Sequence, residues 1–278
     1  MKKRKITRDQ AVRFSIFIIL GILAIFFVLP YIWMILNSFK STKEILMSPK
    51  NIFPEEFTLA GYEKVLTQSP FFTWFKNSAF ITVTNTVVIL FVSALVGYVF
   101  SKFEFRFKNV LFIIVLATMM VPAQTTMIPS FLLISKLGLY NTAGALILPS
   151  FVNAFGIYLC KQFCDEIPKE IIESAKLDGA SDIKIFFKIV MPMIRPALGA
   201  LAIFTFLTYW NDYLNPLIML SEVKKMTLPL ALSFFAQQHM ADLSAQMAAS
   251  ALIMVPVTIV FMAFQKQFIK GIAMTGMK

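Results

Sequence analysis

Six long runs of apolar residues, separated by polar stretches, dominate the pattern along the chain. A helix needs about 20 consecutive apolar residues to cross the hydrocarbon core of a bilayer, where it satisfies its own backbone hydrogen bonds. The pattern therefore predicts an all-α integral membrane protein with six transmembrane helices. The predicted spans are 14–36, 79–100, 110–134, 143–159, 197–220 and 247–264.

Prolines interrupt the last four of these runs. Proline removes a backbone donor and kinks a helix, and transport proteins place such breaks where a pathway forms. Ordinary curvature of membrane helices accounts for the same residues equally well. The prolines are Pro122, Pro129, Pro149, Pro216 and Pro256.

Basic residues are distributed unequally between the two sides of the spans. Of the 26 Lys and Arg residues, 18 lie on the side that holds both chain ends and eight on the other. Because cytoplasmic flanks carry the excess of basic residues, we expect a multi-pass protein of the cytoplasmic (inner) membrane with both termini inside. The predicted organisation is a cytoplasmic N-terminus (1–13), one membrane domain (14–264) and a cytoplasmic tail (265–278). The first outer loop, 37–78, is expected to form a small folded cap.

Composition and charge narrow the class of protein. With 58% hydrophobic and 15% charged residues and a mean hydropathy of +0.74, the chain does not match a water-soluble domain. The net charge of +11 raises nucleic acid as a partner, but the basic residues flank apolar runs instead of forming one stripe. We therefore expect membrane lipid as a partner and no nucleic acid. Cys160 and Cys164 are expected to be small packing residues and not metal ligands, and His239 is assigned no role.

The long cytoplasmic loop 166–196 predicts two short amphipathic helices. Pro168 suits the first turn of one helix, Gly179 a left-handed end, and Ser181 the cap of the next. We expect one apolar face on each helix and charged residues on the other. Two interpretations remain open: the loop docks into a groove on a partner protein, or its apolar faces pack on the membrane domain. The apolar positions are Ile171, Ile172 and Ala175 in the first helix and Ile183, Phe186, Phe187 and Val190 in the second.

The spacing within this loop closely resembles the EAA motif of ABC-importer permeases. That motif reads E-A-A, three residues, G, nine residues, I, one residue, L-P. This chain has Glu173-Ser174-Ala175, then Gly179, Ile189 and Met191-Pro192, so it departs from the motif only at Ser174 and Met191. The stretches 57–62, 74–78, 210–217 and 268–271 resemble the MalG-type branch, whose members import carbohydrates.

The resemblance implies the six-helix fold of ABC-importer permeases and a set of partners. They are a second, MalF-like permease subunit, two cytoplasmic ATPase subunits and an extracytoplasmic sugar-binding protein. ATP is then hydrolysed on separate chains, and this subunit is expected to need no cofactor and to have no catalytic or metal site. The residues that the resemblance places in ATPase coupling are Glu173, Ala175, Asp178, Gly179 and Ala180.

Asp212 is an acid within an otherwise apolar run, where burial costs about 2.5–3.5 kcal/mol. Such a residue should face the helix bundle or a wet cavity, and its neighbours offer surface suited to a sugar path. An equally good interpretation places Asp212 at the outer end of a shifted helix. The candidates for the substrate path are Trp210, Asn211, Asp212, Tyr213 and Asn215.

Two other functions within transport stay open, a permease for a solute other than sugar and a secondary carrier. The predicted spans contain almost no ionisable residues for ion coupling apart from Asp212, and a carrier leaves the 166–196 loop unexplained. A membrane enzyme is disfavoured because no nucleophile and base are brought together by spacing. The C-terminal 271–278 stretch lacks the Gly-Lys-Ser/Thr of a phosphate loop, so nucleotide binding is not expected there.

Overall fold

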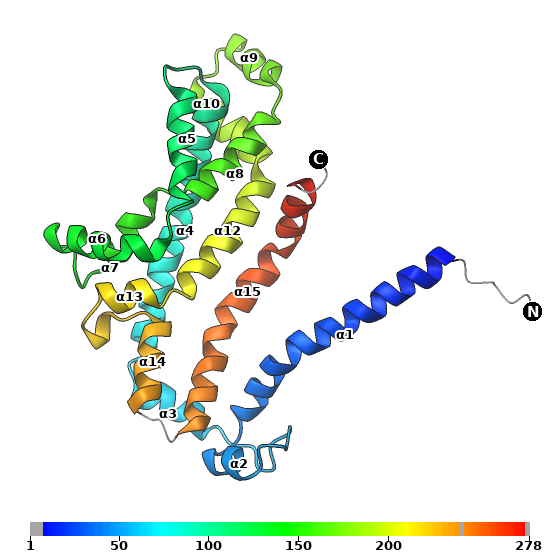
Figure 1. The fold of residues 1–278 in the computed structure, drawn as a ribbon, viewed down its shortest axis with the longest axis vertical. Helices are drawn as coiled ribbons and strands as arrows, with labels where there is room; N and C mark the ends of the chain where they lie inside the picture. Colours follow the sequence, from blue (N-terminus) through cyan, green and yellow to red (C-terminus); the bar gives the residue numbers. More distant parts are fainter. Residues whose placement is uncertain (1–7, 239–241, 276–278) are drawn as a thin grey trace, which may run out of the picture. The chain divides into compact units, whose positions relative to one another are not determined.

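The computed structural model describes residues 8–238 and 242–275, and these residues form helices and no strands (Figure 1). The basic residues 2–5, His239 and the last three residues lie outside the described part. The contacts divide the chain into two compact units, one of residues 1–69 and 235–254 and the other of residues 70–234 and 255–278. Each unit is described by itself.

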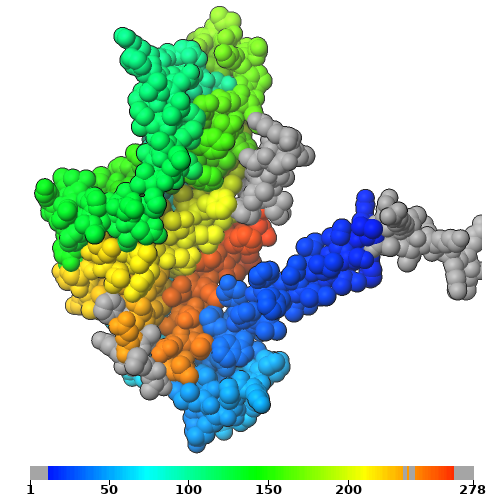
Figure 2. All heavy atoms as spheres, viewed as in Figure 1, coloured from blue at the N-terminus to red at the C-terminus, as the bar shows by residue number. Residues whose placement is uncertain are grey.

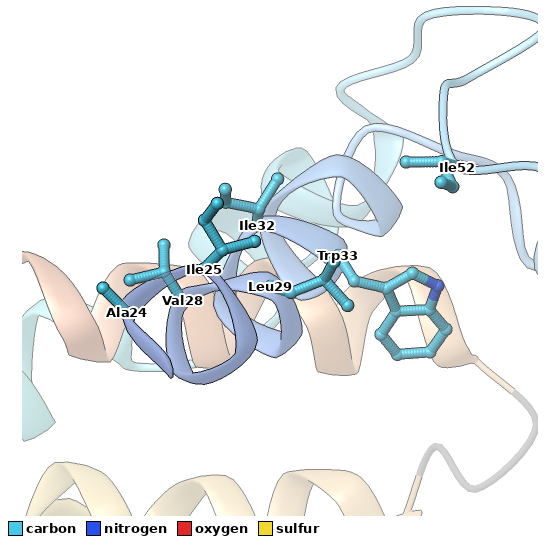
Figure 3. Close-up of a pocket in the computed structure, with 7 residues that line it drawn as sticks. All are labelled: Ala24, Ile25, Val28, Leu29, Ile32, Trp33 and Ile52. Atoms are coloured by element: carbon cyan, nitrogen blue, oxygen red, sulfur yellow. The ribbon is translucent and has the colours of Figure 1, made fainter. Parts of the chain in front are cut away.

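The first unit begins with the long apolar helix α1 (Arg8–Asn37). Its segment Val12–Asn37 is apolar enough to cross a membrane, and its most apolar 18 residues are not buried by the rest of the described chain. Ala24, Val28 and Ile32 line an apolar groove of about 400 Å³ that also includes Ile52 (Figure 3). Helix α1 therefore depends on lipid or another chain to cover its apolar surface.

A small folded cap follows α1, as the sequence predicts for the first outer loop. It contains α2 (Thr42–Met47) and α3 (Ala60–Gln68). Asp242, which precedes α15 (Leu243–Thr275), accepts hydrogen bonds from Thr42 Oγ1 at 2.9 Å, the Ala245 amide at 3.0 Å and Lys64 Nζ at 2.5 Å. Burial raises the pKa of Asp242, but these hydrogen bonds outweigh that effect and hold the pKa below its usual value.

The second unit is built around three packed helices, α4 (Phe71–Lys102), α8 (Ala154–Asp165) and α12 (Arg195–Trp210). Small residues let these helices approach closely. A Cβ on Gly97 would lie 2.8 Å from Cys160 Cβ, and one on Gly156 would lie 2.4 Å from Ser93 Oγ. Small residues at such contacts are typical of membrane helix pairs. Cys160 is fully buried, in agreement with its predicted packing role.

Shorter elements surround this core. Connecting segments include a 3₁₀ turn η1 (Leu148–Phe151), a π-helical turn η2 (Phe186–Val190) and a 3₁₀ turn η3 (Val223–Lys225). The remaining helices are α5 (Lys108–Thr118), α6 (Ala123–Lys136), α7 (Ala143–Ile147), α9 (Lys169–Leu177), α10 (Asp182–Ile185), α11 (Met191–Met193), α13 (Leu214–Met219) and α14 (Leu228–Gln238).

The membrane spans agree with the predicted pattern in number but not in shape. Among the described residues, four helices are long and apolar enough to cross a membrane, or up to six if each of two bent pairs is one span. The predicted third span is broken between α5 and α6 by a bend of 99°. Pro122 explains the break because proline lacks an N–H and disfavours helix at the residue before it.

The predicted fifth span, 197–220, is also wrong as a single helix. Helix α12 ends at Trp210, and the separate short helix α13 begins at Leu214. The side chain of Asp212 accepts a hydrogen bond from the Asn215 amide at 3.2 Å, which favours a new helix start over continuation of α12.

Candidate functional site

Within the 166–196 segment, the exposed turn at Gly179 between α9 and α10 has a defined conformation. Gly179 has φ +75°, the left-handed conformation expected from its position after α9. The amide of Ala180 donates to the Ala175 carbonyl at 2.9 Å, and the amide of Gly179 donates to the Lys176 carbonyl at 3.0 Å. These two bonds are the Schellman arrangement, which satisfies the free carbonyls at a helix end.

Beyond Gly179 the chain starts a second helix at the predicted position. Ser181 caps α10 by accepting a hydrogen bond from the Lys184 amide at 3.3 Å. Lys176 and Asp182 form an ion pair of 3.0 Å across the turn, so the end of α9 and the start of α10 are tied together. Both side chains are about half exposed, and the pair adds little stability of its own.

The residues expected to couple to an ATPase differ in exposure. Glu173, Asp178 and Gly179 are exposed, whereas Ala175 and Ala180 are partly buried against the core of the second unit. In Figure 1, α9 forms one end of the second unit, beyond α8 and α10. The three exposed residues are therefore available to a partner protein, and the two alanines support the turn.

Two apolar residues near this turn are strongly exposed. Leu177 is 90% exposed and Ile183 is 72% exposed. The sequence pattern placed Ile183 on the apolar face of the second helix and assigned no role to Leu177.

The apolar faces of the 166–196 segment pack on the chain's own membrane helices. Ile172, Ile185, Phe186 and Val190 are buried in one cluster with residues of α4 and α8. Of the four apolar positions predicted for the second helix, Phe186 and Val190 are buried and Ile183 and Phe187 are exposed. Ile185, which was not among them, is buried as well. The π-helical turn η2 explains the change, because its i→i+5 bonding shifts the helical period.

A second candidate site lies where α12 gives way to α13. Asp212 and Asn215 line two adjoining cavities of about 270 and 280 Å³. Ala123 and Met127 of α6 line both cavities as well. Helix α6 packs against α13, and Figure 2 shows their green and yellow atoms in contact.

The cavities have a mixed lining with many polar groups. The cavity of about 270 Å³ is lined by the hydroxyls of Thr126 and Ser130 on α6, Ser150 on η1 and Tyr209 on α12. Such a set of donors and acceptors matches a ligand rich in hydroxyl groups. The second cavity adds the polar residues Gln124, Asn211 and Tyr213.

The structure brings together four of the five predicted path residues and places the fifth elsewhere. Asn211, Asp212, Tyr213 and Asn215 line the cavities. Trp210, which the sequence grouped with the path residues, lines neither cavity. It is 1% exposed and stacks on Phe206, with the ring centroids 5.6 Å apart. The lining residues on α6 and η1 were missed because only tertiary folding brings them to Asp212.

Buried polar residues support the wall of the cavity that Ser150 lines. Ser150 Oγ donates to Asn85 Oδ1 at 2.9 Å, and Asn85 Nδ2 donates to the Leu146 carbonyl at 3.2 Å. Asn85 is fully buried in α4. These bonds fix α7 and η1 on α4, so the hydroxyl of Ser150 is held at the cavity.

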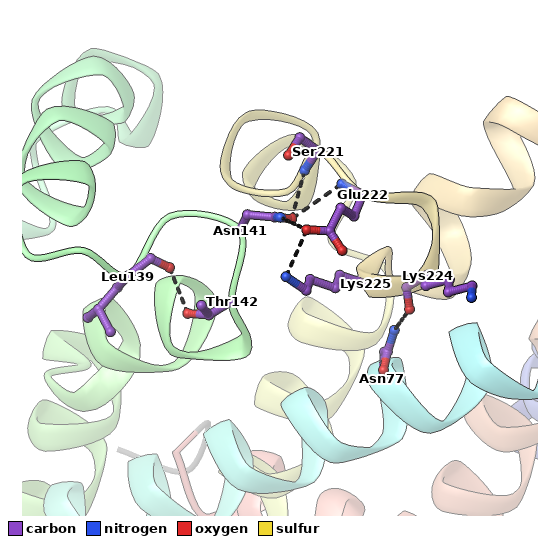
Figure 4. A network of polar contacts seen from close by, with 8 residues as sticks. All are labelled: Asn77, Leu139, Asn141, Thr142, Ser221, Glu222, Lys224 and Lys225. Atoms are coloured by element: carbon purple, nitrogen blue, oxygen red, sulfur yellow. Dashed lines mark hydrogen bonds and ion pairs between the residues drawn. The ribbon is translucent and has the colours of Figure 1, made fainter.

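Asn141 ties the far end of α13 to the α6–α7 connection (Figure 4). Its Oδ1 accepts from the Ser221 amide at 3.1 Å and the Glu222 amide at 3.3 Å, and its Nδ2 donates to Glu222 Oε1 at 2.7 Å. Hydrogen bonds from Lys225 and Asn141 hold the pKa of Glu222 below its usual value. Asn77 of α4 donates to the Lys224 carbonyl at 2.9 Å. The connection after α13 is thus anchored from two elements.

Comparison with known proteins assigns the chain to a family. The model of the "Binding-protein-dependent transport system inner membrane component" family matches residues 89–274. The arabinooligosaccharides transport system permease protein AraQ of Bacillus subtilis (strain 168) is 32% identical over 96% of this chain and 96% of its own length. The lactose transport system permease protein LacG of Rhizobium radiobacter is 32% identical over 94% and 93%.

A solved structure agrees with the sequence relatives. A chain of a bacterial ABC transporter involved in the import of the acidic polysaccharide alginate superposes with a TM-score of 0.83 at 26% identity, covering 96% of this chain and 100% of that one. Members of the family are transmembrane permease subunits and not enzymes, and ATP is hydrolysed on separate subunits. This chain therefore belongs to the binding-protein-dependent transport system inner membrane components, the permeases of ABC importers, and is a multi-pass membrane protein.

Proposed function

We propose that this permease forms half of the translocation path of an ATP-driven importer for a saccharide. The observation that carries the proposal is the lining of the cavities at Asp212, where hydroxyl, amide and carboxylate groups from α6, η1, α12 and α13 converge. Relatives named for arabinooligosaccharides, diacetylchitobiose and lactose support a saccharide. The other half of the path belongs to a second, MalF-like permease, and an extracytoplasmic sugar-binding protein delivers the substrate.

The 166–196 segment is the proposed contact with two cytoplasmic ATPase subunits. Its apolar residues are packed in the core of the second unit, so a movement of the exposed turn caused by the ATPase is transmitted to α4 and α8 through direct contacts. Glu173, Leu177 and Asp178 present one apolar and two acidic side chains to a partner. This arrangement requires both chain ends on the cytoplasmic side.

Reconstitution tests the proposed function. Proteoliposomes that contain this permease, its partner permease and the ATPase subunits should hydrolyse ATP faster when the binding protein and a saccharide are added. The saccharide should accumulate inside only with ATP. Accumulation that persists without the ATPase subunits would instead establish a secondary carrier, and stimulation only by solutes other than sugars would establish a different substrate class.

A further inference from the structure

We propose that the cavities at Asp212 admit neutral saccharides and reject acidic ones, and that Asp212 sets this preference. The inference rests on the proposed function and names the substrate class of the same site. Asp212 lines both cavities, and neither lining contains Lys, Arg or His. Among the described residues, the one charged group in the lining is therefore an anion.

The hydrogen bonds of Asp212 fit a carboxylate that carries no proton. Its Oδ1 accepts from the Asn215 backbone amide at 3.2 Å, and its Oδ2 accepts from the Asn215 side-chain amide at 2.9 Å. Both oxygens act as acceptors toward N–H donors, which favours the charged form and opposes the effect of burial. A carboxylate offers about four acceptor sites, and the amides of Asn215 and Leu214 occupy three of them, so a sugar hydroxyl can donate to Asp212 without displacing Asn215.

A uronic acid would meet the opposite situation. Its carboxylate would enter a partly enclosed space that already holds a negative charge and has no cation among its described lining residues. Coulomb repulsion between two such groups is weakly screened away from bulk water, and desolvation of the second anion adds to the cost. The hydroxyl of Ser150 does not offset the repulsion, because its proton is donated to Asn85 Oδ1 and only its acceptor side is left for a ligand.

The fold alone does not decide the charge of the substrate. The solved structure with the same fold belongs to an importer of an acidic polysaccharide, alginate. A charge preference of the path itself must therefore come from its side chains, and Asp212 is the described lining residue whose charge bears on it.

The first experiment measures the charge of the cavity without any substrate. Ser130→Cys places a nearly isosteric thiol in the lining, and Cys160 and Cys164 stay unreactive because they are fully buried. In membranes with the whole transporter, the thiol is treated with cationic, anionic and neutral methanethiosulfonates. The ratio of cationic to anionic rates should fall at least tenfold when Asp212→Asn is added. Gln68→Cys, on the exposed surface of α3, is the control whose ratio should not change.

The second experiment measures selectivity with a matched pair of saccharides, galactobiose and digalacturonate. In the reconstituted transporter the neutral sugar should enter at least tenfold faster, and Asp212→Asn should reduce that ratio. Three results would overturn the inference: a cation-to-anion ratio independent of Asp212, no reaction of the Ser130→Cys thiol with the neutral reagent, or digalacturonate uptake equal to galactobiose uptake. Failure of the proposed function would give a different result. No saccharide would then enter, whereas the ratio of cationic to anionic reaction rates at the Ser130→Cys thiol could still be measured.

Discussion

Replacing Gly179 tests whether the left-handed turn is needed for contact with the ATPase. At φ +75° a Cβ costs about 1–2 kcal/mol, and a β-branched side chain costs more. No atom of the described residues lies within 4 Å of the position that a Cβ would take, so the cost is confined to the backbone. An energy of 1–2 kcal/mol corresponds to roughly a 5- to 30-fold lower population of the native turn.

A series of variants separates backbone strain from steric conflict with the partner. Asn tolerates the left-handed region, so Gly179→Asn should retain most ATPase association. Gly179→Ala should weaken the association about 5-fold and Gly179→Val by about 30-fold or more, judged by copurification and by substrate-stimulated ATP hydrolysis. The amount of permease in the membrane should change little, because the turn is exposed.

Gly138 provides a matched control for this series. It ends α6 with φ +71° and the same pair of hydrogen bonds, Leu139 amide to Ile134 carbonyl at 3.1 Å and Gly138 amide to Ser135 carbonyl at 3.1 Å. A Cβ there also meets no atom within 4 Å. Gly138→Val should leave ATPase copurification intact. The reasoning is refuted if Gly138→Val lowers copurification as much as Gly179→Val, or if the Asn variant fails as fully as the Val variant.

Three further predictions concern stability and topology. Gly156→Ala places a methyl group 2.4 Å from Ser93 Oγ and should destabilise the second unit by about 1–3 kcal/mol. The unfolding temperature in detergent should fall accordingly. Gly21→Ala, which adds a methyl group in open space, should not lower it. Because the pKa of Asp242 is depressed in the folded state, its contribution to stability is present above about pH 3.9 and is lost as the pH falls through the folded-state pKa. Asp242→Asn should remove the loss of stability that is due to this carboxylate, as measured by unfolding between pH 7 and pH 3. Glu173→Cys should react with an impermeant thiol reagent only from the cytoplasmic side, and labelling from outside would reverse the proposed orientation.

Local features of the fold were predictable from local sequence signals. The span at 14–36 agrees with the structural span Val12–Asn37 because one long apolar run decides it, and Pro30 lies within the helix without ending it. Gly179 and Ser181 adopt their predicted conformations because a helix stop and a cap depend on neighbours within a few residues.

Features that depend on competition between distant contacts were not predictable. The 99° bend between α5 and α6 follows a proline, yet Pro129 lies within the helix α6, so proline alone does not locate a break. Trp210 was grouped with Asp212 by adjacency in sequence, but packing on Phe206 and Phe75 buries it. The cavity required α6 and η1 to reach Asp212, which no periodic pattern encodes.

Site-directed crosslinking from Leu177 tests most directly the claim that this permease is driven by separate ATPase subunits. Leu177 is 90% exposed at the end of α9, so a photoreactive residue there disturbs no contact within the described chain. In membranes that contain the whole transporter, the probe at Leu177 should form a crosslink to an ATPase subunit, and the same probe at exposed Leu214 beside the cavity should not. A crosslink from Leu214 but none from Leu177 would contradict the account.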